Sequence, residues 1–124
     1  MPLLWNATTD AIVATRIDTL STFFQRAVGL LTRSSMRPDE GVWITPCRAI
    51  HTIGMHFPID VIFVDVADRV ADIIADVRPN RLALGCARAR GVIELGSGAL
   101  REIDLQIGDR LELISSYLER RKAV

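Results

Sequence analysis

The sequence predicts a mostly β, single-domain protein: an antiparallel β-sandwich or barrel with one short N-terminal helix around residues 19–28. Short apolar runs recur between turn residues, which is typical of strands joined by tight connections. Only one segment has helical spacing, so the helices that parallel crossovers require are missing. The composition, 49% hydrophobic and 24% charged over 124 residues, suits a single globular core.

The N-terminal third is expected to hold a leader, a strand and the helix. Residues 1–10 are predicted to be a flexible leader to a single β-rich domain over residues 11–116. Alternating residues over Ala11–Ile17 predict the first strand. The period then becomes helical, with one apolar stripe made of Leu20, Phe23, Phe24, Ala27 and Val28. Gly29 follows the stripe, where a left-handed residue often ends a helix.

The rest of the domain reads as strands and turns. The expected strands are the short apolar runs Val42–Ile44, Asp60–Val66, Val70–Val77, Val92–Leu95 and Arg110–Ser115. The run over 60–66 is rich in β-branched apolar residues, which predicts an inner strand, and the run over 70–77 is its hairpin partner. Residues 117–124 are expected to form a charged tail.

Charge and composition argue against several classes of protein. The chain has 15 basic and 15 acidic residues, so it lacks the positive surplus of a nucleic-acid-binding protein. The opening "MPLLWNATTD" lacks the pattern of a signal peptide, and no run is long enough to span a membrane. We therefore expect a cytoplasmic protein with no membrane partner and reduced Cys47 and Cys86. The oligomeric state stays open.

The densest cluster of chemically active side chains is "CRAIHTIGMHFPID", Cys47 to Asp60. Many polar groups in one loop of an apolar scaffold favour a non-enzymatic binding module. Its ligand is expected to be a small polar or anionic molecule or a peptide. Nearby arginines add the ability to clamp a carboxylate or phosphate. The candidate ligand-binding residues are Arg48, His51, Thr52, Met55, Asp60, Arg81 and Arg88.

Three alternatives stay open. An enzyme would use His51 as general acid or base and Asp60 as its orienting partner. A metal-binding protein would use Cys47, His51 and either Cys86 or Asp60, although the paired short spacings of a closed zinc site are absent. A subunit with a purely structural role would need an exposed strand edge or apolar patch. We predict no resident metal or cofactor.

One acidic residue lies in an apolar run. Glu94 sits within "VIELG", and a carboxyl group that faces inward there needs a partner. An arginine or His51 is the candidate partner.

Several motifs, in order, resemble the domain of unknown function 192 family: "AVGLLTRSSM", "IHTIGMHFPIDVIFVD", "VIELGSG" and "LQIGDRLEL". The resemblance runs from about Ile12 to Ile114. The Gly-Leu-Met pattern of that family appears here as Gly29-Leu30-Leu31, a mild departure. The resemblance implies a small β-rich sandwich with a short helix, and it implies no established activity, substrate or cofactor.

Overall fold

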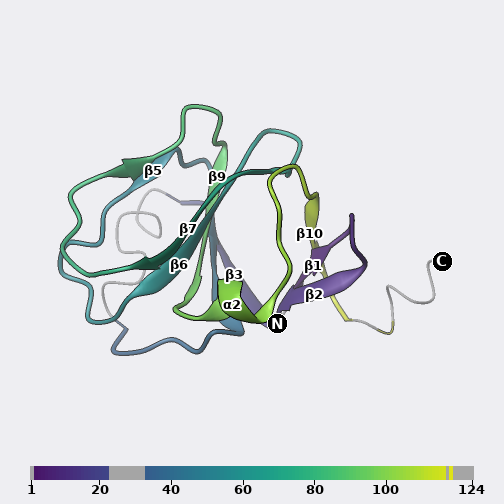
Figure 1. The fold of residues 1–124 in the computed structure, drawn as a ribbon, viewed down its shortest axis with the longest axis horizontal. Helices are drawn as coiled ribbons and strands as arrows, with labels where there is room; N and C mark the ends of the chain where they lie inside the picture. Colours follow the sequence, from purple (N-terminus) through teal and green to yellow (C-terminus); the bar gives the residue numbers. More distant parts are fainter. Residues whose placement is uncertain (1, 23–32, 117, 119–124) are drawn as a thin grey trace.

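A computed structural model of the chain describes residues 2–22, 33–116 and 118 (Figure 1). The described residues form a mostly β fold with three sheets. The central five-stranded sheet has the order β3 (Arg16–Leu20), β4 (Glu40–Ile44), β9 (Gly91–Gly96), β6 (Ile59–Val64) and β7 (Val70–Val77). A three-stranded sheet has the order β10 (Leu111–Ile114), β1 (Leu3–Asn6) and β2 (Ala11–Ala14). The third sheet pairs β5 (Ala49–Ile50) with β8 (Leu84–Gly85).

The central sheet is covered on both faces. All six residues of β6 and all six of β9 are buried. Successive side chains of β6 point to opposite faces, so Ile62 packs into one core and Val61 into another. A strand that is buried on both faces reads as a continuous apolar run. The predicted inner strand is therefore confirmed as β6, although it ends at Val64 and leaves Asp65 and Val66 outside it.

The first core lies between the central sheet and the three-stranded sheet. Leu4 and Leu111 of the three-stranded sheet belong to the same buried cluster as Ile62 and Ile93 of the central sheet. The short helix α2 (Ala99–Glu102) closes one side of this core with Ala99. The second core lies on the opposite face, where Met55 and Phe57 pack on the sheet beside the β5–β8 pair.

Two N-terminal predictions differ from the structure. Residues 3–6 are not a flexible leader: β1 is the middle strand of the three-stranded sheet and pairs with both β2 and β10. Its partner β10 lies more than a hundred residues later, and local sequence patterns cannot reveal such a distant pairing. In the helix predicted over 19–28, Thr19 and Leu20 instead belong to β3. Residues 23–32 lie outside the described residues.

The sheets are not purely antiparallel and do not close into a barrel. β3 pairs with β4 in parallel, with Arg16 opposite Glu40 and Leu20 opposite Ile44. Parallel neighbours require a long connection, and residues 21–39 supply one. The central sheet ends at β3 on one side and β7 on the other, so it stays open. The predicted first strand, Ala11–Ile17, is instead divided between β2 and β3, which belong to different sheets. The other sequence-predicted strands are confirmed as β4, β7, β9 and β10.

The burial of β1 can be tested with a matched pair of leucine substitutions. Leu4 is 0% exposed and Leu82 is 80% exposed. We expect Leu4→Ala to lower the free energy of unfolding by about 2–5 kcal/mol, because it leaves a cavity in the first core. Leu82→Ala should change it by less than about 0.5 kcal/mol. Urea denaturation measures both values. Equal, small effects would mean that the N-terminal segment is loosely held after all.

Candidate functional site

Thr52 is a structural residue at the base of the 47–60 loop. Its side chain is buried, and Oγ1 donates a hydrogen bond to the Arg78 carbonyl (2.7 Å) and accepts one from the Arg81 amide (2.8 Å). The Thr52 amide donates to the Arg81 carbonyl (3.0 Å). The Thr52 carbonyl accepts from the amides of Asn80 (2.9 Å) and Met55 (3.2 Å). All polar groups of Thr52 are thus used to tie the loop to residues 78–81.

Asp60 is also structural. It is 1% exposed, and its Oδ1 accepts a hydrogen bond from the Asp76 amide (2.8 Å). Its Oδ2 accepts from the Leu100 amide (2.8 Å). The carboxylate therefore joins β6 to the end of β7 and to α2, where buried amides need acceptors. Both oxygens are already engaged by the backbone.

The acid–base pair that the sequence suggested is not assembled. His51 is exposed and makes no side-chain hydrogen bond or ion pair within residues 2–22 and 33–116. Asp60 is buried and held by backbone amides, so it does not orient the imidazole. Met55, a third candidate, is buried in the second core. Three of the seven candidate residues thus support the fold.

The other four candidates are exposed and lie on two segments that the structure joins: Arg48, His51, Arg81 and Arg88. β5 pairs with β8 through Ala49 and Gly85, and the Cys86 amide donates to the Arg48 carbonyl (3.1 Å). Thr52 then binds the Arg81 backbone in both directions. These contacts place the 45–59 segment beside the 77–93 segment.

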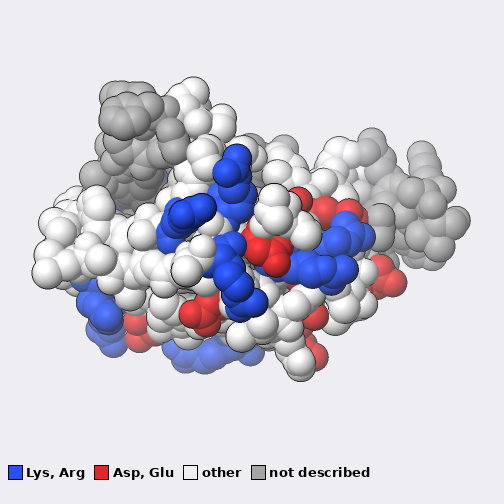
Figure 2. Space-filling model, turned by 90° about the horizontal axis from the view of Figure 1, so that it is seen from above, with Lys and Arg blue, Asp and Glu red and all other residues white. Residues whose placement is uncertain are grey.

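These two segments have a strong charge bias that the net charge of the chain conceals. Residues 45–59 and 77–93 contain five arginines, two histidines and no aspartate or glutamate. The remainder of the chain has ten basic and fifteen acidic residues. We name these two segments the basic region. Figure 2 views the end at which the β8–β9 connection projects and shows several basic side chains close together near its middle, with acidic ones beside some of them.

Within the basic region, Arg78 forms an ion pair with Asp76 (3.5 Å), whereas the other arginines of the region form none with the described residues. In the part of the chain that the structure describes, the ion pairs engage Arg33, Arg37, Arg78 and Arg110. Arg48 and Arg81 have no acidic side-chain partner there. Arg88 donates from Nη2 to the Ala71 carbonyl (3.1 Å), a neutral acceptor, so its guanidinium group has no acidic partner among the described residues. The sequence feature that could have identified this region is the absence of aspartate and glutamate from both segments.

The described residues do not form the ligand set that the metal-site hypothesis requires. Within the described residues, no three side chains of His, Cys, Asp or Glu gather closely enough to hold a metal ion. Cys47 and Cys86 are partly buried, and Cys47 Sγ lies 3.2 Å from the Ala49 carbonyl oxygen. None of the helices in the described ranges is long and apolar enough to cross a membrane.

Glu94 is the most strongly perturbed titratable group that the structure places. It lies on β9, where its register partners are Val42 of β4 and Val61 of β6. The side chain is 4% exposed and makes no hydrogen bond or ion pair with the described residues. Burial raises the pKa of its carboxyl group to about 7. The arginine or His51 partner that the sequence suggested is not present there.

The raised pKa of Glu94 predicts a pH-dependent stability. Below pH 4.5, the pKa of this carboxyl group in the unfolded state, the group is protonated in both the folded and the unfolded state. The free energy of unfolding then has its full value. Between that value and about 7, only the folded state keeps the proton, so the free energy of unfolding falls by about 3 kcal/mol as pH rises. Glu94→Gln should remove this part of the slope in urea denaturation from pH 4 to 8. Glu102→Gln, at an exposed position, is the control, and wild-type behaviour of both variants would contradict the assignment.

Comparison with known proteins gives the family. The DUF192 family model, described as "Uncharacterized ACR, COG1430", matches residues 5–113. A UPF0127 protein of Thermococcus sibiricus is 30% identical over 115 residues, covering 89% of this chain and 73% of that protein. A UPF0127 protein of Pyrococcus horikoshii is 34% identical over 96 residues, covering 73% and 80%.

A solved structure shares the fold. The crystal structure of a protein of unknown function from Novosphingobium aromaticivorans matches with a TM-score of 0.78 and 24% identity, over 90% of this chain and 84% of that one. The family match begins within β1, ends within β10 and includes the whole basic region. The resemblance noted in the sequence is therefore confirmed, and the chain belongs to the DUF192 family of uncharacterised proteins.

Proposed function

We propose that this protein is a non-enzymatic binding module for a small anion, either a phosphate or a carboxylate, at the exposed side of the basic region. The contacts would come from Arg48, His51, Arg81 and Arg88. The observation that carries the proposal is the joining of two segments that hold five arginines and no acidic residue. Thr52, Met55 and Asp60 then support the site without contacting the ligand.

The guanidinium groups suit this role for two reasons. Arginine presents a planar fork of donors that matches the oxygens of carboxylate and phosphate. Arg48 and Arg81 also have no acidic partner among the described residues, so a ligand would not have to displace an ion pair. A surface that is already positive favours both the encounter with an anion and its retention.

The backbone beneath these side chains supports them. The β5–β8 pairing, the Cys86–Arg48 hydrogen bond and the two-way Thr52–Arg81 contact fix the chain at three points. Side chains on a fixed backbone lose less conformational entropy when a ligand binds. The proposal includes the cytoplasmic location that the sequence predicts.

A titration with inorganic phosphate and with citrate, followed by calorimetry at low salt, tests the proposal. We expect Arg48→Ala, Arg81→Ala and Arg88→Ala each to raise the Kd about three- to tenfold, since each removes one charge-assisted contact. Arg101→Ala is the matched control, because Arg101 is an exposed arginine on α2 outside the basic region. Affinity should also fall as salt concentration rises.

Two outcomes would overturn the proposal. One is the absence of binding by either anion to the wild-type protein. The other is an equal loss of affinity in Arg101→Ala and in the variants of the basic region, which would reflect net charge alone. Variants that unfold are recognised by circular dichroism, and His51→Ala, at an exposed residue without contacts in the described ranges, then serves as a substitution that should preserve the fold.

A further inference from the structure

A polar cavity of about 240 Å³ lies at the β3–β4 edge of the central sheet. It is lined by Arg16, Asp18, Arg33, Glu40 and Gly41, and we name it the edge cavity. Arg16 and Glu40 are the first residues of β3 and β4 and are directly opposite in the parallel register. The basic region follows the other end of β4, through residues 45–48. The two sites are therefore separate.

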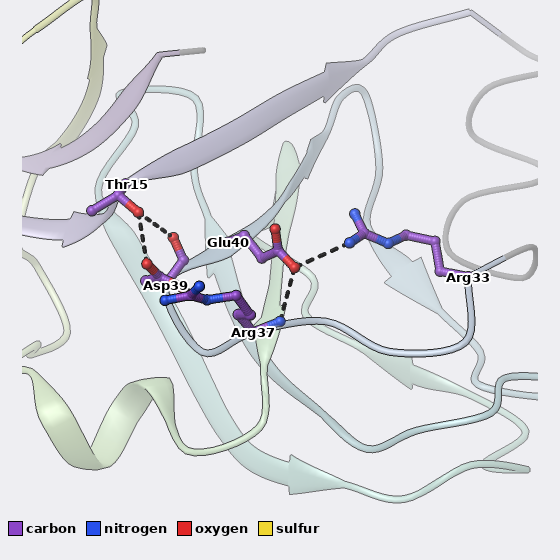
Figure 3. A network of polar contacts seen from close by, with 5 residues as sticks. All are labelled: Thr15, Arg33, Arg37, Asp39 and Glu40. Atoms are coloured by element: carbon purple, nitrogen blue, oxygen red, sulfur yellow. Dashed lines mark hydrogen bonds and ion pairs between the residues drawn. The ribbon is translucent and has the colours of Figure 1, made fainter.

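One wall of the edge cavity is internally neutralised (Figure 3). Arg33 donates from Nη2 to Oε1 of Glu40 (3.1 Å), and the Arg37 amide donates to the same oxygen (2.9 Å). The Glu40 side chain is 17% exposed, so this pair is held in a partly desolvated position. Figure 3 shows Arg33 and Glu40 pointing toward each other from two neighbouring segments. Neither charge needs a ligand.

Two other residues that line the cavity, Arg16 and Asp18, carry charges that no described residue neutralises. Arg16 and Asp18 are two positions apart on β3, so their side chains leave the same face of the strand about 7 Å apart. Ile17 between them points into the first core. Within the described residues, neither the Arg16 nor the Asp18 side chain makes a hydrogen bond or an ion pair. The cavity thus offers one free cation and one free anion beside a neutral wall.

We propose that the edge cavity binds a small zwitterion, an amino acid whose carboxylate contacts Arg16 and whose ammonium group contacts Asp18. A ligand with both charges satisfies both side chains, whereas a ligand with one charge leaves the opposite group unpaired. β3 is the end strand of the central sheet, so among the described strands none has to move for a ligand to reach the cavity. This site does not depend on anion binding at the basic region.

A titration with alanine, followed by the backbone amide signals in ¹H–¹⁵N spectra, tests the proposal in the wild-type protein. We expect saturable shifts at Arg16, Asp18 and Gly41. Propionate and ethylammonium, each with one of the two charges, should shift these signals at least tenfold more weakly at equal concentration. Shifts caused equally by propionate would indicate an anion site and overturn the proposal, as would the absence of shifts with alanine. Propionate bound at the basic region would instead shift the signals of Arg48 and Arg81.

Charge-neutral variants give a second test. Arg16→Gln and Asp18→Asn should each raise the Kd for alanine about tenfold or more, with dispersed spectra as evidence of folding. Arg101→Gln and Asp104→Asn are the matched controls, because both residues are exposed and neither lines the cavity. Wild-type affinity in the first two variants would overturn the proposal. If either variant unfolds, the comparison of alanine with propionate in the wild-type protein decides the question.

Discussion

The burial of β6 and β9 on both faces is the constraint on which the rest of the structure depends. Each strand supplies side chains to two cores. Leaving either face open to water would expose these apolar side chains and lower the free energy of unfolding. The three-stranded sheet and α2 cover one face. The 47–60 loop and the β5–β8 pair cover part of the other. The secondary elements outside the central sheet can be understood as covers for its two faces.

This constraint explains why much of the polar content of the 47–60 loop is structural. A loop that covers a core has to satisfy its own backbone groups, because water does not reach them. Thr52 does this by binding the backbone of residues 78–81, and Met55 fills the second core beneath. On the opposite face of the central sheet, Asp60 accepts hydrogen bonds from the backbone amides of Asp76 and Leu100. Arg48 and His51 are exposed and take no part in this covering role.

Much of the fold could be predicted from local patterns, and particular parts could not. The strands β4, β6, β7 and β9 were found because their apolar runs are bounded by turn residues. The strand β1 was missed because its four residues are stabilised by partners at residues 11–14 and 111–114. The burial of Asp60, and the lack of a partner for Glu94 among the described residues, depend on the packing of neighbouring strands.

The sequence by itself determined the fold class, the inner strand, the family and the presence of two segments without acidic residues. Those properties follow from the order and spacing of residues along the chain. Only the tertiary structure decided that these two segments adjoin, that Thr52 and Asp60 face inward, and that Arg16 and Asp18 share a cavity with Arg33 and Glu40. Each of these depends on contacts between residues far apart in the chain, whose free energy arises from packing and desolvation and not from local sequence.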